Sequence, residues 1–266
     1  MHRRWCSVSL GLVLACGGAA TSSGPSAAVH DAASADVAPS EEPTPARVER
    51  VRHDVRADDG HPIAVWEKSM PGAKGIVVLV HGRTWSGVPD FDLQVPGKDR
   101  SLMDALVARG FATYAIDLRG YGGTKRDHSG WVTPNRADAD IAATLAWIAA
   151  RHPGLPKPAV LGWSLGSLVV QLAAQRRPES MSAAILYGYP RDPQRPATAT
   201  DHDPATPPAQ ANTRANAASD FITPASIDQA TIDAYVDAAL AADPVRADWR
   251  SMSQWAELDP AKVKVP

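Results

Sequence analysis

Cysteine is nearly absent from this sequence of 266 residues, which contains only Cys6 and Cys16. Both lie near the N-terminus, so we expect no internal disulfide to stabilise the rest of the chain. An excess of one charge is also lacking, because 27 Lys and Arg residues oppose 29 Asp and Glu residues. This balance excludes a protein that binds nucleic acid through a strongly basic surface. Beyond the first residues, no apolar run approaches the roughly 20 residues that span a bilayer. A globular protein with one main domain is expected.

The N-terminal residues 1–15 resemble an export signal, with basic residues followed by the apolar stretch 5–15. The sequence Val13-Leu14-Ala15-Cys16 resembles a bacterial lipobox, in which cleavage leaves a cysteine that becomes lipid-modified. This resemblance implies a cell-envelope protein that is anchored to the membrane through Cys16, and ordinary secretion is the alternative. Residues 16–46 are rich in Ala, Pro and Ser, which predicts a flexible stalk.

Residues 47–189 show apolar, β-branched runs that alternate with amphipathic segments. A hairpin is expected first, with a turn at Asp58-Asp59-Gly60. Further strands are predicted at 75–80, 111–116, 159–162 and 181–187, and helices at 99–109, 134–151 and 165–176. Strands that alternate with helices predict an α/β fold with a mostly parallel central sheet and flanking helices.

Residues 190–257 predict a helical cap inserted over the sheet. A proline-rich stretch of low complexity comes first, and a helix is expected at about 226–242. Tyr235, Trp249 and Trp255 either shape an apolar substrate pocket or only pack the cap against the core. Residues 258–266 resemble the beginning of a further part of the core.

The motif Gly162-Trp163-Ser164-Leu165-Gly166 matches G-x-S-x-G at a strand end that opens a helix. In that position the serine is typical of a nucleophile at a sharp turn, and the N–H of Leu165 is placed to stabilise an oxyanion. A glycine-rich turn without chemistry is the alternative interpretation.

Three ordered motifs resemble the α/β-hydrolase fold family from about Val48 to Pro266: His81-Gly82, Asp117-Leu118-Arg119-Gly120-Tyr121-Gly122 and the Ser164 turn. The resemblance implies a serine hydrolase of the esterase, lysophospholipase or serine aminopeptidase type, with a small or medium ester or an amide as substrate. It also implies that the N–H of Arg83 completes the oxyanion hole and that His81 is structural. A dinucleotide site is disfavoured, because no G-x-G-x-x-G follows the first strand. Neither a metal nor a cofactor is expected.

The catalytic acid and base are the one departure from the family pattern, which places both after the serine. His202 is the only histidine after Ser164, and it lies in the low-complexity stretch. Asp192 is an alternative acid, although a solvated loop aspartate is the favoured interpretation of this residue. We therefore expect the acid, the base and two strands to lie beyond Pro266, so that the chain is a fragment or a truncated product with little activity. An inactive lipoprotein that binds ligands on a hydrolase scaffold is the second hypothesis, and an acyltransferase or haloperoxidase-like relative is the third.

Overall fold

A computed structural model describes residues 47–191, 201, 203–223 and 225–266. The predictions for the leader, the stalk and Cys16 concern residues outside these ranges, as do those for Asp192 and His202. In the described ranges, no helix is both long and apolar enough to cross a membrane.

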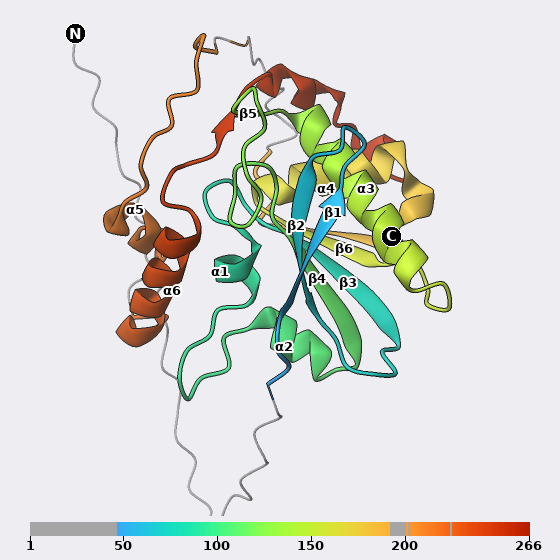
Figure 1. Ribbon diagram of the computed structural model, residues 1–266, viewed down its shortest axis with the longest axis horizontal. Helices are drawn as coiled ribbons and strands as arrows, with labels where there is room; N and C mark the ends of the chain where they lie inside the picture. Colours follow the sequence, from blue (N-terminus) through green and yellow to red (C-terminus); the bar gives the residue numbers. More distant parts are fainter. Residues whose placement is uncertain (1–46, 192–200, 202, 224) are drawn as a thin grey trace, which may run out of the picture. The chain divides into compact units, whose positions relative to one another are not determined.

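The centre of the molecule is a six-stranded sheet in the order β1-β2-β4-β3-β6-β7 (Figure 1). β3 pairs in parallel with β4 and β6, and β6 pairs in parallel with β7, whereas β1–β2 and β2–β4 are antiparallel. The sheet is therefore mixed and mostly parallel, and the predicted α/β fold is confirmed. Its strands are β1 (Val51–Arg56), β2 (Pro62–Lys68), β3 (Gly75–Val80), β4 (Phe111–Ile116), β6 (Ala159–Trp163) and β7 (Ala183–Tyr187).

Helices cover both faces of this sheet. Every residue of β3 is buried, as a continuous apolar strand at the centre of a parallel sheet should be. Side chains on one face pack against α3 and α4, and side chains on the other face pack against α1 and α2. The helices are α1 (Gly87–Phe91), α2 (Leu102–Val107), α3 (Pro134–Arg151) and α4 (Leu165–Arg176), with a 3-10 turn at Pro178–Ser180.

Local capping determines where the helices begin. α3 begins as predicted, because Pro134 occupies its first turn and the Thr133 side chain accepts the N–H of Arg136. α2 is shorter than the predicted 99–109. The hydroxyl of Ser101 accepts the N–H of Asp104 and caps the helix there, so Leu102 is its first residue.

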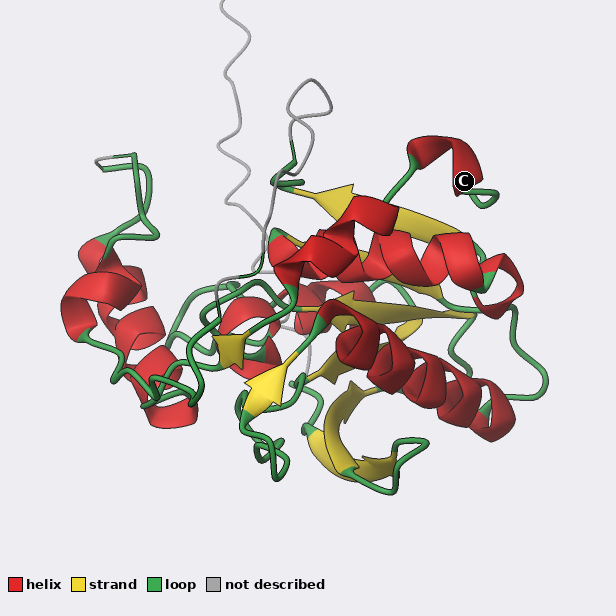
Figure 2. Ribbon diagram, turned by 90° about the horizontal axis from the view of Figure 1, so that it is seen from above, coloured by secondary structure: helices red, strands yellow, loops and turns green. Residues whose placement is uncertain are grey.

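The described part of the cap contains a helix pair, α5 (Arg214–Ala218) and α6 (Gln229–Ala242). Figures 1 and 2 both place this pair at one side of the sheet, beyond α1. Trp85, which lies in the loop after β3, is buried among apolar side chains of α5 and α6. The cap therefore packs directly on the loop that follows His81-Gly82.

The chain returns from α6 to the core along a short strand, β8 (Asp248–Trp249), which pairs with β5 (Trp131–Val132). 3-10 turns follow at Met252–Glu257 and Pro260–Lys262. Trp249 and Trp255 stack with ring centroids 6.2 Å apart inside the main core, and Tyr235 is buried in the cap. The burial of all three aromatic residues supports the packing interpretation.

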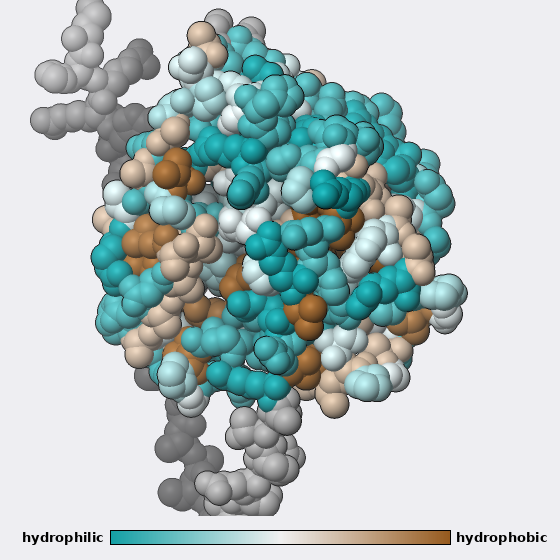
Figure 3. Space-filling view, in the orientation of Figure 1, coloured by the Kyte–Doolittle hydropathy of each residue, from teal (hydrophilic) through white to brown (hydrophobic). Residues whose placement is uncertain are grey.

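β7 is an edge of the sheet, and its apolar side chains are partly uncovered. Ile185, Leu186 and Tyr187 are 45%, 37% and 65% exposed. The N–H of Ala184 donates to the carbonyl of Pro266 at 2.8 Å, so the segment before Pro266 lies along this edge. Elsewhere, hydrophilic residues cover most of the surface seen in Figure 3, and hydrophobic residues appear there only as small scattered patches.

Candidate active site

Ser164 lies at the sharp turn between β6 and α4. Its backbone has φ 51° and ψ −118°, a conformation that is strained for any residue other than glycine. The Ser164 N–H donates to the carbonyl of Tyr187 at 2.9 Å, and the Ser167 N–H donates to the Ser164 carbonyl at 2.9 Å. The turn is thus held by the end of β7 and by the first turn of α4. Strain of this kind is typical of a functional serine.

Both glycines of the motif are needed, because backbone atoms of neighbouring segments lie too close to leave room for a side chain. A Cβ on Gly162 would lie 2.4 Å from the carbonyl oxygen of Gly166. A Cβ on Gly166 would lie 2.4 Å from the carbonyl oxygens of both Val80 and His81. The second contact also shows that α4 begins directly against the end of β3.

The loop after β3 lies beside Ser164, because β3 and β6 are neighbouring parallel strands with Val80 opposite Gly162. A Cβ on Gly82 would lie 3.5 Å from the Cβ of Ser164. Arg83 follows Gly82, and its carbonyl accepts a hydrogen bond from the Tyr121 hydroxyl. Leu165 is the first residue of α4, so its N–H has no partner inside the helix. The structure thus brings Ser164, Leu165 and the Arg83 loop together, and their catalytic roles remain predictions.

His81 is fully buried and links two loops. Its Nε2 accepts the N–H of Leu118 at 3.0 Å, so Nδ1 carries the proton and donates to the Gly82 carbonyl at 2.8 Å. Its ring also packs against Tyr121, with centroids 4.4 Å apart. These contacts agree with a structural role for His81, which joins the loop after β3 to the loop after β4.

Burial lowers the pKa of His81 to about 4, against about 6.5 in an unfolded chain. Between these values the unfolded protein binds a proton that the folded protein does not, so His81 destabilises the fold as pH falls from 6.5 to 4. We expect this effect to reach about 3 kcal/mol. The difference in free energy of unfolding between wild type and His81→Gln should shrink by that amount from pH 7 to pH 4. Other titrating groups are common to both proteins, so their contributions cancel. An equal difference in free energy of unfolding at both pH values would contradict a lowered pKa of His81.

Asp117 holds the loop after β4 in place. Its carboxylate accepts N–H groups of Gly87 at 2.9 Å and Gly123 at 2.8 Å, and the indole N–H of Trp66 at 2.7 Å. Burial raises the pKa of Asp117 to about 6 in spite of these bonds. The sequence motif included this aspartate, but its contacts with three separate elements could not be predicted from it.

A second acidic residue, Asp90, joins the cap to the loop beside Ser164. It accepts the Tyr235 hydroxyl of α6 at 3.2 Å and the N–H of Gly82 at 3.4 Å. Burial raises the pKa of Asp90 well above its usual range, and the charge of Asp243 adds to this. Sequence reasoning missed Asp90, because no motif includes it.

No histidine of the described residues hydrogen-bonds to Ser164. His53 pairs with Glu67, His61 with the carbonyl of Lys125, and His152 with the Tyr114 hydroxyl. His152 is the C-cap residue of α3. His128 lies in the turn before Gly130. The described ranges also contain no group of three or more His, Cys, Asp or Glu residues suited to a metal ion.

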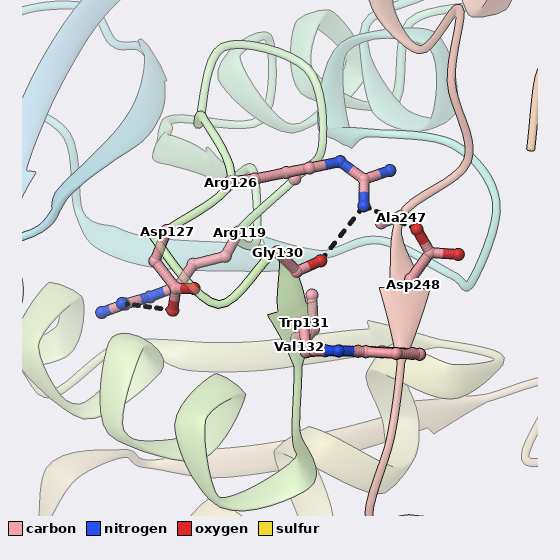
Figure 4. Close-up of a pocket in the computed structure, with 9 residues that line it drawn as sticks. Arg119, Arg126, Asp127, Gly130, Trp131, Val132, Ala247 and Asp248 are labelled. Atoms are coloured by element: carbon pink, nitrogen blue, oxygen red, sulfur yellow. Dashed lines mark hydrogen bonds and ion pairs between the residues drawn. The ribbon is translucent and has the colours of Figure 1, made fainter. Parts of the chain in front are cut away.

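A crevice lined by the loop after β4 and by the strand pair β5–β8 is drawn in Figure 4. Arg126 bridges it, donating to the Gly130 carbonyl at 3.1 Å and to Asp248 at 2.7 Å. Arg119 binds Asp127 on the same loop at 3.2 Å. Ser164 does not line this crevice, which is therefore a structural joint between the core and the segment returning from the cap.

A family model described as serine aminopeptidase, S33, matches residues 71–258. Pimeloyl-(acyl-carrier protein) methyl ester esterase from Neisseria meningitidis serogroup B is 37% identical to this chain over 123 residues, which are 45% of this chain and 38% of that protein. The chain thus spans well under half the length of this curated relative.

Solved structures resemble the chain over about half its length. An esterase from Pyrococcus furiosus matches with a TM-score of 0.45 and 19% identity, over 54% of this chain and 51% of the esterase. An epoxide hydrolase from Vigna radiata matches with a TM-score of 0.44 and 24% identity, over 57% of this chain and 43% of the hydrolase.

Proposed function

The chain belongs to the serine aminopeptidase S33 family of α/β-hydrolases, and from this membership we propose that it hydrolyses carboxylic esters through Ser164. One observation carries the proposal: Ser164 occupies the strained turn at φ 51° between β6 and α4, beside the loop that follows Gly82. The similarity to an enzyme named as a methyl ester esterase supports an ester as substrate.

In the proposed reaction, the Ser164 hydroxyl attacks the ester carbonyl and expels the alcohol, which leaves an acyl group on the serine. The N–H groups of Leu165 and Arg83 stabilise the negative oxygen of the tetrahedral intermediate. Water then attacks the acyl-enzyme and releases the acid. A general base must accept the proton of the serine and later that of water. We place this base and its acid partner outside the described residues, because no described histidine hydrogen-bonds to Ser164.

Peptide hydrolysis is the second candidate, and the name of the serine aminopeptidase family favours it. A panel of p-nitrophenyl esters and aminoacyl p-nitroanilides separates the two on the full-length protein. If the protein is an ester hydrolase, its kcat/KM should be at least a hundredfold higher for a short acyl ester than for any anilide. A higher value for an anilide would favour the aminopeptidase, and turnover of neither substrate class would favour an inactive scaffold.

The membrane anchor is also a proposal, supported by the lipobox-like sequence before Cys16. Expression in a bacterial host should place the wild-type protein in the membrane fraction and shift Cys16→Ala to the soluble fraction. A Cys6→Ala variant is the matched control, since its cysteine lies inside the signal segment. Identical partition of wild type and Cys16→Ala would contradict the anchor.

A further inference from the structure

The loop after β3 carries the Arg83 N–H, and the carbonyls on both sides of this N–H are held by hydrogen bonds. The Gly82 carbonyl accepts the Nδ1–H of His81 at 2.8 Å. The Arg83 carbonyl accepts a hydrogen bond from the Tyr121 hydroxyl. A trans peptide is planar with its N–H pointing away from its carbonyl, so the bond to Gly82 fixes the direction of the Arg83 N–H. In the described part of the chain this N–H donates to no other group, which leaves it available to an oxyanion.

The chain that returns from the cap to the core also holds this loop. We call residues 243–249 the return segment, which runs from the end of α6 to the strand beside β5 in Figure 1. Asp243 is the C-cap residue of α6 and is only 3% exposed. One oxygen of its carboxylate accepts the N–H of Ser86 at 2.8 Å, and the other accepts the N–H of Gly122 at 2.7 Å. Asp243 thus ties the end of the cap helix to the loops after β3 and β4.

The other end of the return segment reaches the same loop through Tyr121. The indole N–H of Trp249 donates to the Tyr121 hydroxyl at 2.7 Å, so the hydroxyl proton is directed at the Arg83 carbonyl. Both aromatic side chains are buried in the main core, and the Tyr121 ring packs on His81 with centroids 4.4 Å apart. The two ends of the return segment therefore act on one short stretch, residues 83–86.

We propose that the return segment positions the oxyanion hole, with Asp243 and Tyr121 as positioning residues that orient the Arg83 N–H. A shift of α6 would move Asp243 and with it the loop after β3, so the position of the cap controls whether the oxyanion hole is formed. This inference rests on the proposed function, because the oxyanion hole belongs to the reaction of Ser164. A donor that acts on the developing oxyanion lowers the barrier without tightening substrate binding, so its misplacement should lower kcat and leave KM unchanged.

Tyr121→Phe in the full-length protein tests the proposal, because it removes one hydroxyl and keeps the aromatic ring. With p-nitrophenyl butyrate as substrate, kcat should fall about tenfold or more, whereas KM should stay within about twofold of wild type. Tyr114→Phe is the matched control. Tyr114 is also buried, but its hydroxyl is hydrogen-bonded to His152, and its loss should leave kcat within about twofold of wild type.

Asp243→Asn is the second variant, and it should show the same fall in kcat at unchanged KM. The amide nitrogen of asparagine cannot accept an N–H, so one of the two loops loses its bond. Asp138→Asn is its matched control, because Asp138 is equally buried and binds one arginine on each oxygen, Arg176 and Arg177. This control should keep kcat within about twofold of wild type.

Hydrogen exchange of the amides in residues 81–86, followed by mass spectrometry, adds a measurement that needs no turnover. The Tyr121 hydroxyl bonds to a carbonyl and protects no N–H itself, so exchange changes only if the loop moves. Exchange should be about tenfold faster in Tyr121→Phe than in wild type and unchanged in Tyr114→Phe. Thermal unfolding of each variant shows whether the fold is intact.

Unchanged exchange in Tyr121→Phe would overturn the inference. In a protein that hydrolyses esters, it would also be overturned by an unchanged kcat in Tyr121→Phe or by an equal fall in Tyr114→Phe. The proposed function fails separately, if the wild-type protein hydrolyses no ester while exchange is still faster in Tyr121→Phe. The return segment would then position the loop as proposed, in a protein with another activity.

Discussion

Gly166→Ala should destabilise the protein by more than about 4 kcal/mol, or prevent it from folding. A Cβ at this position would lie 2.4 Å from two backbone carbonyl oxygens at the end of β3, and backbone atoms inside a sheet cannot move away without breaking strand pairing. Urea unfolding measures the effect. Gly154→Ala is the matched control, because no atom lies within 4 Å of a Cβ there, and its free energy of unfolding should stay within about 0.5 kcal/mol of wild type.

A Gly166→Ala protein within about 1 kcal/mol of wild type would mean that α4 does not begin against β3 as described. The turn that presents Ser164 would then have a different geometry. This outcome would remove the main structural support for a nucleophile at that position.

Ser164→Ala should abolish ester hydrolysis, with a fall in kcat of about a million-fold for an intact triad. Ser180→Ala is the matched control, because Ser180 lies in the 3-10 turn at Pro178–Ser180 and should leave activity unchanged. Ser164→Gly should also be inactive, yet its free energy of unfolding should rise by about 1 kcal/mol, since glycine adopts a φ of 51° without strain. An inactive but more stable protein is the signature of strain kept for function. Retained turnover in Ser164→Ala would exclude Ser164 as nucleophile.

The sequence was most informative where a pattern had a single physical explanation. A strand with a continuous apolar run, such as 75–80, is stable only when both of its faces are buried, and the structure buries every residue of this strand. Likewise, glycines on both sides of Ser164 predicted a sharp turn, and each proved to be excluded from bearing a Cβ by nearby backbone atoms. Local rules thus sufficed for the sheet, for α3 and α4, and for the position of the serine.

Contacts between segments far apart in the sequence could not be predicted in the same way. β5 and β8 are two residues long, and they exist only because the segment after α6 returns to the core. No motif predicts that Asp90 accepts a hydrogen bond from the Tyr235 hydroxyl, or that Arg246 donates one to the Thr84 hydroxyl. These contacts join the cap and the segment after α6 to the loop beside Ser164, whereas the Ser164 turn itself follows from the local motif.

The role of Ser164 is tested most directly by treating the full-length protein with a fluorophosphonate probe and locating the adduct by tandem mass spectrometry. We expect a single adduct on Ser164, formed near neutral pH and absent from the Ser164→Ala protein. An adduct on another serine, or no adduct on a folded protein, would contradict the claim that Ser164 is the nucleophile of an ester hydrolase.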